Sequence, residues 1–248
     1  MQKLKGLIIP TLLLALWIAI GDRFPPMILP SFADTMQTLR ELIQNGEMGS
    51  AWRGSMFRII YATALSASIS IVLGLLSRSF IAAREIIMPF TNFIRYIPVT
   101  VFYPLLIIWL GIDEEMRIAF LFIATFFAFF PSVMLTLDSI SPSLIEKALT
   151  AGAGKFKMMV HVYIPATLPS LCRSFLAMIS IGFTYMIIAE TTNVRYGLGY
   201  LMIIGSARGR TSIVFAAIIV TILTGVVIDV SGNFLIRKVF RWDENVRS

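Results

Sequence analysis

Few residues in this 248-residue chain could carry out chemistry, and their types exclude several kinds of site. With one Cys, Cys172, and one His, His161, a disulfide framework is impossible and a Cys/His metal centre is not expected. A G-x4-G-K-[ST] phosphate loop is absent from the sequence, because Gly154-Lys155 is followed by Phe156. We therefore expect no catalytic residue and no metal site, and a chain that cannot hydrolyse ATP by itself.

The scarce charged residues are set in an unusually apolar chain. Hydrophobic residues make up 57% of the sequence and charged residues 14%, with a mean hydropathy of +0.83. Soluble domains are about 25% charged. The net charge of +7 fits a membrane protein in which Lys and Arg collect in cytoplasmic loops better than it fits a nucleic-acid binder. The composition therefore predicts an all-α membrane protein.

Uncharged runs divide the chain into six predicted transmembrane helices within one domain, residues 1–248. Crossing the hydrocarbon takes about 17–25 helical residues. The predicted spans are residues 7–21, 57–77, 86–110, 117–137, 170–190 and 211–235. The first is short and follows Lys3 and Lys5, so a cleaved signal peptide is the alternative interpretation. The distribution of Lys and Arg favours N- and C-termini in the cytoplasm.

The third span is predicted to be bent, because Pro89, Pro98 and Pro104 each remove a backbone donor. Backbone carbonyls freed at membrane depth need neighbours or a water-filled cavity. Arg95 is an ionisable residue within this span, although it lies close enough to the inner face to snorkel. The candidate pathway residues on this span and near the end of the fifth are Arg95, Tyr96, Pro98, Tyr103, Thr184, Tyr185 and Glu190.

Two short segments are predicted to form helices on the outer surface. Ser31 and Asp34 have the spacing of a capping box, at the start of an amphipathic run that ends at Asn45-Gly46. Gly197-Leu198-Gly199 opens a second segment, residues 200–207, which is too short to cross a bilayer. We expect the second segment to be a re-entrant or interfacial helix at the outer mouth.

Small residues spaced by four mark the faces on which membrane helices approach closely. One predicted packing stripe lies on the second span and another on the sixth. The first consists of Ala62, Ser66, Ser70 and Gly74, and the second of Ala217, Thr221 and Gly225. For the stripe that carries the serines, a polar permeation path is the alternative.

The segment from 138 to 169, between the fourth and fifth spans, carries helix signals of its own. Pro142 suits a first helical turn, and Glu146 is close enough to favour the helix N-terminus. Gly152 and Gly154 interrupt the run, and residues 156–162 resume it. The sequence therefore predicts a helix-turn-helix on the cytoplasmic surface.

The spacing within this loop resembles the E-A-A-x3-G-x9-I-x-L-P motif of bacterial ABC importer permeases. The matching segments are Glu146-Lys147-Ala148, Gly152 and Val162-Tyr163-Ile164-Pro165, with Lys147, Val162 and Ile164 as departures from the motif. The resemblance covers nearly the whole chain. Within the family, the chain is similar to the permeases of the nitrate, sulfonate and taurine branch. This similarity includes the Pro-rich segment 25–31, Arg95-Tyr96-Ile97-Pro98, and Glu190 with Gly197-Leu198-Gly199.

This resemblance implies a multi-pass permease subunit of the bacterial inner membrane. It implies a homodimer that forms the pathway, two ATPase subunits that bind ATP and Mg, and an extracytoplasmic solute-binding protein or lipoprotein. No cofactor is implied on this chain. The residues implied in coupling to the ATPase are Glu146, Lys147, Ala148, Gly152, Ala153, Gly154, Val162, Ile164 and Pro165.

The branch implies a small oxyanion or an organic sulfonate as the substrate. Similar permeases carry heterocycles such as pyrimidine vitamin precursors, so such a molecule is an alternative. A secondary transporter or channel without an ATPase is another, but it predicts inverted-repeat halves and mid-membrane charges that the sequence does not display convincingly. Nothing positive in the sequence supports a scaffold or sensor.

Overall fold

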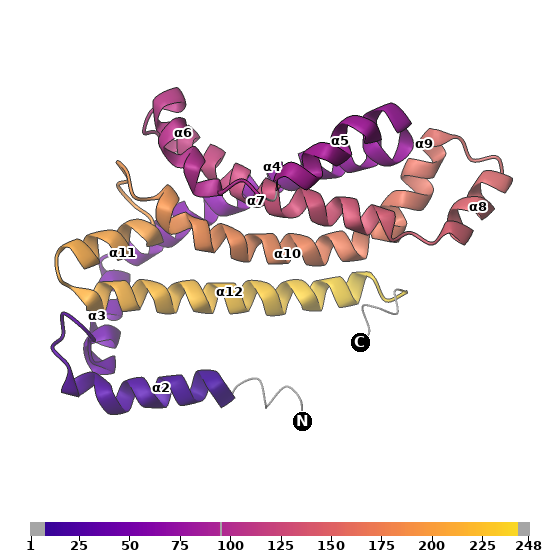
Figure 1. The fold of residues 1–248 in the computed structure, drawn as a ribbon. Coiled ribbons are helices and arrows are strands. Elements are labelled where there is room, and N and C mark those ends of the chain that lie inside the picture. The colour runs from indigo at the N-terminus through magenta and orange to yellow at the C-terminus, as the bar shows by residue number, and fades with distance from the viewer. Residues whose placement is uncertain (1–7, 95, 243–248) are drawn as a thin grey trace. The chain divides into compact units, whose positions relative to one another are not determined.

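The computed structural model describes residues 8–94 and 96–242, and these residues form helices and connecting segments without a strand (Figure 1). The all-α prediction is therefore confirmed for this part of the chain. The N-terminal half contains α2 (Ile8–Ile20), η1 (Gly21–Arg23), α3 (Phe32–Gln44), α4 (Glu47–Ser79), α5 (Ile81–Ile94), η2 (Val99–Val101) and α6 (Phe102–Leu110). The C-terminal half contains α7 (Glu114–Asp138), α8 (Pro142–Thr150), α9 (Lys155–Met158), η3 (Met159–Tyr163), α10 (Ile164–Ala189), α11 (Leu198–Ala207) and α12 (Thr211–Val239).

Four continuous helical stretches in the described residues are long and apolar enough to cross a membrane. They are Glu47–Ser79, Glu114–Asp138, Lys155–Ala189 and Thr211–Val239. A fifth span is obtained when α5 and the η2–α6 segment, which are bent by 90° from each other, are taken as one broken helix. The 13 residues of α2 would cover roughly 20 Å at 1.5 Å per residue. The described residues therefore give four or five spans, and the count of six stays a prediction.

The bend predicted for the third span is present. Pro98 follows the end of α5 and precedes the short η2 turn, in a conformation that does not continue the helix. Pro104 lies in the first turn of α6, where its missing N–H costs little. Pro89 lies inside α5. Of the three prolines, Pro98 therefore stands between the two helical pieces, at the position where a straight span would have continued.

The chain divides into two compact units. One comprises residues 1–56 and 190–224, and the other comprises residues 57–189 and 225–248. We call the first the terminal unit and the second the central unit. In the terminal unit, the Thr38 hydroxyl on α3 donates to Ser212 at 3.0 Å, and Trp17 packs edge-on against Phe32. As predicted, Ser31 caps α3 by accepting the Asp34 N–H at 3.0 Å.

The core of the central unit lies between α7 and α10. Phe129, Val133 and Leu137 of α7 are buried together with Leu171 and Met178 of α10. Ser132 and Ser174 also meet through their hydroxyls at 3.0 Å. The packing of α7 against α10 therefore forms the main core of the central unit.

Small residues on α4 and α10 lie where helices approach each other closely in the central unit. A Cβ on Gly74 would lie 2.7 Å from the Val133 side chain, and one on Gly182 would lie 2.7 Å from Ile59. Ala62, Ser66 and Ser70 are completely buried. On α12, Ala217 is buried and accepts the Thr221 hydroxyl at its carbonyl, while Gly225 has no neighbouring atom within 4 Å of where a Cβ would stand.

Candidate functional site

The predicted helix-turn-helix is present as α8, a short turn and α9. Pro142 occupies the first turn of α8, as expected. The helix ends because Gly152 adopts a positive φ of 78°, a conformation that strains residues with a Cβ. The Gly152 N–H donates to the Leu149 carbonyl at 2.9 Å, and the Ala153 N–H reaches back to the Ala148 carbonyl at 3.0 Å. This pair of bonds is a Schellman motif, so glycine at this position of the loop has a backbone reason.

The second arm of the hairpin runs without a break into the long helix of the fifth span. α9 begins at Lys155, passes through the π-helical turn η3 and continues as α10 to Ala189. The sequence predicts a fifth span from residue 170 and a loop that ends at 169, and these bounds stay predictions. The structure has one continuous helix that starts at Lys155 and contains both Pro165 and Pro169. A displacement of the hairpin can therefore be transmitted along one continuous helix.

The hairpin has one face anchored in the core of the central unit and one face exposed. Val162, Met158 and Tyr163 are buried in the same cluster as Phe129 and Leu137 of α7. Ala148, Ala153 and Ile164 are half-buried against this cluster. The exposed predicted coupling residues are Glu146, Lys147, Gly152, Gly154 and Pro165. The predicted coupling residues therefore include both the attachment of the hairpin and its free surface.

A second candidate site is a cavity of about 380 Å³ in the central unit, between the bend that joins α5 to η2, α7 and α10. It brings together three predicted pathway residues, Pro98, Thr184 and Tyr185. Its other described walls are aliphatic side chains and Phe127, and none of its described lining residues carries a charge. Such a cavity suits a small apolar or neutral group.

The other predicted pathway residues lie elsewhere. The Tyr103 ring packs edge-on against Phe120, with 5.3 Å between ring centroids, and Phe120 packs in the same way against the cavity residue Tyr185, with 6.0 Å between centroids. Tyr103 does not itself line the cavity. Tyr96 is 84% exposed and does not line the cavity. Arg95 lies outside the described residues.

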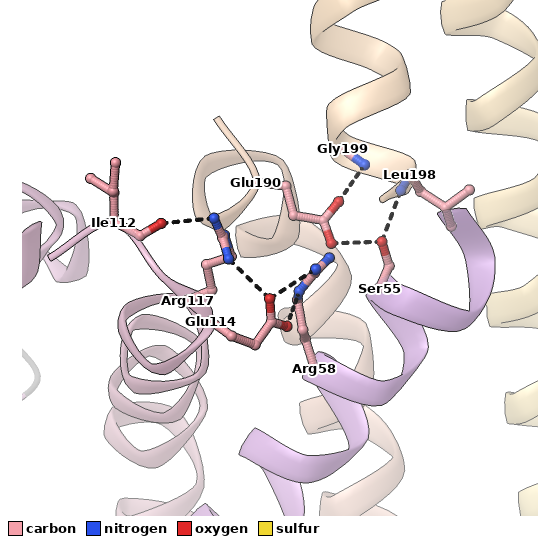
Figure 2. A network of polar contacts seen from close by, with 8 residues as sticks. All are labelled: Ser55, Arg58, Ile112, Glu114, Arg117, Glu190, Leu198 and Gly199. Carbon is pink, nitrogen blue, oxygen red and sulfur yellow. Dashed lines mark hydrogen bonds and ion pairs between the residues drawn. The ribbon is translucent and has the colours of Figure 1, made fainter. Parts of the chain in front are cut away.

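Glu190 belongs to the terminal unit, where its carboxylate holds the N-terminus of α11 (Figure 2). One carboxylate oxygen accepts the Ser55 hydroxyl at 2.7 Å, and the other accepts the Gly199 N–H at 2.8 Å. Ser55 completes the arrangement by accepting the Leu198 N–H at 2.8 Å. The first amide groups of a helix have no partner within it, and a negative charge at this end is favourable. Glu190, 1% exposed, therefore anchors the short helix.

Gly197 is required by this anchor. A Cβ at residue 197 would lie 2.2 Å from a carboxylate oxygen of Glu190. The spacing of Glu190 and Gly197-Leu198-Gly199, which sequence analysis noted without a physical reason, is thus explained by a carboxylate that crosses a loop to cap a helix.

A charged network that sequence reasoning missed lies in the central unit, also drawn in Figure 2. Arg58 of α4, 1% exposed, donates through Nε and a terminal nitrogen to the two carboxylate oxygens of Glu114 at the start of α7. Arg117 donates to the same carboxylate at 2.9 Å and to the Ile112 carbonyl at 2.8 Å. The two guanidinium groups thus share one acidic side chain and fix the start of α7 to α4.

These features define a multi-span helical membrane protein in which an exposed helical hairpin continues into a spanning helix. Residues 66–241 match the family model described as the binding-protein-dependent transport system inner membrane component, and the chain belongs to this family. It is therefore an ABC transporter permease.

Two relatives cover most of the chain. It is 26% identical over 242 residues, 96% of its length and 87% of the relative's, to an aliphatic sulfonates transport permease protein, SsuC, of Bacillus subtilis (strain 168). It is 23% identical over 242 residues, 95% of its length and 88% of the relative's, to the taurine transport system permease protein TauC of Escherichia coli (strain K12).

The fold is similar to that of a chain in the crystal structure of a bacterial ABC transporter involved in the import of alginate. The TM-score is 0.67 at 17% identity, over 96% of this chain and 93% of the other. The likeness covers the whole architecture rather than one helical hairpin.

Proposed function

We propose that the chain works as the permease subunit of an ATP-driven importer and that the hairpin 142–165 docks on a separate ATPase. The observation that carries this proposal is the hairpin itself. Its spacing follows the importer motif, its turn is fixed by the positive φ of Gly152, and it exposes Glu146 and Lys147 while Val162 anchors it in the core. Together with membership of the family, this geometry suits a surface that a partner grips.

The continuity of α9, η3 and α10 supplies a mechanism for coupling. Glu146 offers an exposed charge to a basic side chain of the ATPase, and the small, half-buried Ala148 lets α8 lie close to the core cluster that anchors the hairpin. Movement of the ATPase pair displaces the hairpin, and the continuous helix passes the displacement to the membrane-spanning segments. Two permease copies rocking in this way alternate access to a pathway between them. ATP and Mg are bound by the ATPase, and this chain carries no cofactor.

We further propose a small oxyanion or organic sulfonate as the substrate. The names of the two relatives support this class, since one is an aliphatic sulfonates permease and the other a taurine permease. The cavity lined by Pro98, Thr184 and Tyr185 suits the carbon portion of an organic sulfonate. In importers of this family an extracytoplasmic solute-binding protein or lipoprotein delivers the substrate, and we propose that selection of the anionic group falls largely to that partner.

The proposed setting is the bacterial inner membrane with both termini in the cytoplasm. In this orientation α8 and α9 lie on the cytoplasmic side, where the ATPase is, and α11 lies on the opposite side. Reporter fusions after Thr150 and after Tyr200 test the orientation. We expect the first to report the cytoplasm and the second the exterior, and the reverse result would remove the docking site from the side of the ATPase.

Site-specific photocrosslinking tests the docking directly. A photoreactive amino acid at the exposed Lys147 of α8 should capture the co-expressed ATPase. The same amino acid at Val226 of α12, which is 54% exposed, is the control and should not capture it. Absence of capture from position 147 in a complex that transports would contradict the proposal.

A further inference from the structure

A small basic cavity lies in the central unit where the end of α4 meets α8 and α9. Its volume is about 250 Å³, and Arg78, Ser79, Leu149, Lys155 and Tyr163 are among its lining residues. We call it the basic pocket. A water molecule takes roughly 30 Å³ of liquid volume, so the pocket has room for a polyatomic group.

The two cations of the basic pocket are placed against aromatic rings. The Arg78 guanidinium lies over the Tyr163 ring, 5.8 Å from its centroid, and the Lys155 ammonium lies 4.7 Å from the centroid of Phe80. Among the described residues, no ion pair joins Arg78 or Lys155 to a carboxylate. The pocket therefore holds two positive charges without a counter-charge from the described chain.

Two buried polar atoms at the pocket also lack partners within the described part of the chain. They are Nε of Arg78, a donor, and Oγ of Ser79, which can donate or accept. Buried polar atoms are nearly always hydrogen-bonded, because leaving them without a partner forfeits their hydration. An anionic group with several acceptor oxygens would satisfy both atoms and neutralise the guanidinium. A phosphate fits this requirement, since its oxygens match the planar donors of arginine.

The surroundings of the basic pocket favour a lipid as the source of the phosphate. The pocket lies at the last residues of α4, a helix long and apolar enough to cross a membrane. Exposed apolar side chains flank it in sequence: Phe80 is 42% exposed, Ile81 80% and Phe156 75%. Aromatic rings and basic side chains at the end of a membrane span are typical of the headgroup level, and basic pockets between spans bind anionic headgroups.

We propose that the basic pocket binds the phosphate of an anionic phospholipid headgroup through Arg78, Ser79 and Lys155 and thereby holds the α8–α9 hairpin against the end of α4. The site goes beyond the proposed transport function. It makes the attachment of the hairpin depend on the lipid that surrounds the protein.

The test is retention of phosphatidylglycerol by the purified full-length chain in detergent, measured by native mass spectrometry. We expect R78Q and K155Q each to weaken retention by about tenfold, because each removes a charge-assisted contact to the phosphate. The matched control is K157Q, which removes an exposed charge from the same short helix but does not line the pocket. It should retain the lipid within twofold of the unchanged chain.

Further arms distinguish the sources of the anion. Phosphatidylcholine is zwitterionic, because a choline cation balances its phosphate, and it should be retained at least tenfold less than phosphatidylglycerol. Millimolar inorganic phosphate should not displace the bound lipid. Displacement by inorganic phosphate would overturn the lipid assignment, and displacement by the ATPase would assign the pocket to an acidic side chain of that partner. Retention by the R78Q/K155Q double variant equal to that of the unchanged chain would overturn the site. Because the assay needs no ATPase, its failure is distinct from failure of the proposed coupling.

Discussion

Two basic clusters of the central unit handle positive charge in opposite ways. In the network of Arg58, Glu114 and Arg117, the guanidinium groups converge on a carboxylate, and Arg58 is almost completely buried. In the basic pocket, Arg78 and Lys155 lie on aromatic rings, and no described carboxylate reaches them. In the first cluster a carboxylate of the chain itself balances the guanidinium charge, so this cluster has a structural role. The second lacks a counter-charge, which is the property expected of a place where something binds.

The comparison predicts its largest effect at Glu114. E114Q should destabilise the protein by about 2–4 kcal/mol, because it removes the negative charge that balances the buried guanidinium of Arg58. The matched control is E115Q, which neutralises the adjacent exposed carboxylate. Thermal unfolding in detergent, followed as the loss of monodisperse protein, is the measurement. Equal stability of E114Q and E115Q would mean that the network is not structural.

Glu190 of the terminal unit is a second charged group whose partners come from the chain itself, Ser55 and the Gly199 N–H. G197A should cost about 2 kcal/mol, because its Cβ would collide with the carboxylate that caps α11. The control is G49A on α4, where a Cβ meets no atom within 4 Å. Limited proteolysis near residues 191–199 should become faster in G197A and remain unchanged in G49A. If both variants are cleaved at the same rate, the contact does not hold the helix.

A methyl group added at Gly152 should destabilise the turn of the hairpin, whereas one added at Gly154 should not. G152A should destabilise the end of α8 by about 1–2 kcal/mol, since its φ of 78° is unfavourable for alanine. G154A is the control, because Gly154 has a φ of −71° and open space around it. Hydrogen exchange of the α8 amides measures the difference. Unchanged exchange in G152A would show that the Schellman turn is not needed to close the helix.

The smallest effect is expected in the basic pocket without lipid. In lipid-free detergent, R78Q should change stability by no more than about 1 kcal/mol, because the chain loses a cation–π contact but leaves no carboxylate behind. Added phosphatidylglycerol should then stabilise the unchanged chain and have little effect on R78Q, as a ligand stabilises only the state that binds it. If R78Q lost as much stability as E114Q, Arg78 would have a structural role like that of Arg58, and the two clusters would not differ.

Sequence reasoning succeeded where the signal is local. The apolar runs predicted helices, Ser31 predicted the cap of α3, and Gly152 predicted the break between α8 and α9. These features depend on residues a few positions apart, which a sequence displays directly. The bend of the third span followed in the same way from the prolines around Pro98.

The arrangements that join distant parts of the chain could not be predicted in this way. Arg58 and Glu114 are separated by 56 positions, and Ser55 and Glu190 by 135. In the sequence, Glu114 is one of several acidic residues in a turn, and only the packing of α4 against α7 selects it. Pro165 and Pro169 indicate a helix boundary in a sequence, but both lie within a continuous helix here.

The central claim, that the hairpin couples this permease to an ATPase, is tested most directly by measuring transport and substrate-stimulated ATP turnover in proteoliposomes with E146K. The control is E85K, which makes the same charge reversal at an exposed glutamate of α5. We expect E146K to lose both activities by at least about tenfold, because it turns an attraction to a basic partner into a repulsion, while E85K retains them. Full transport and stimulated turnover in E146K would contradict the account.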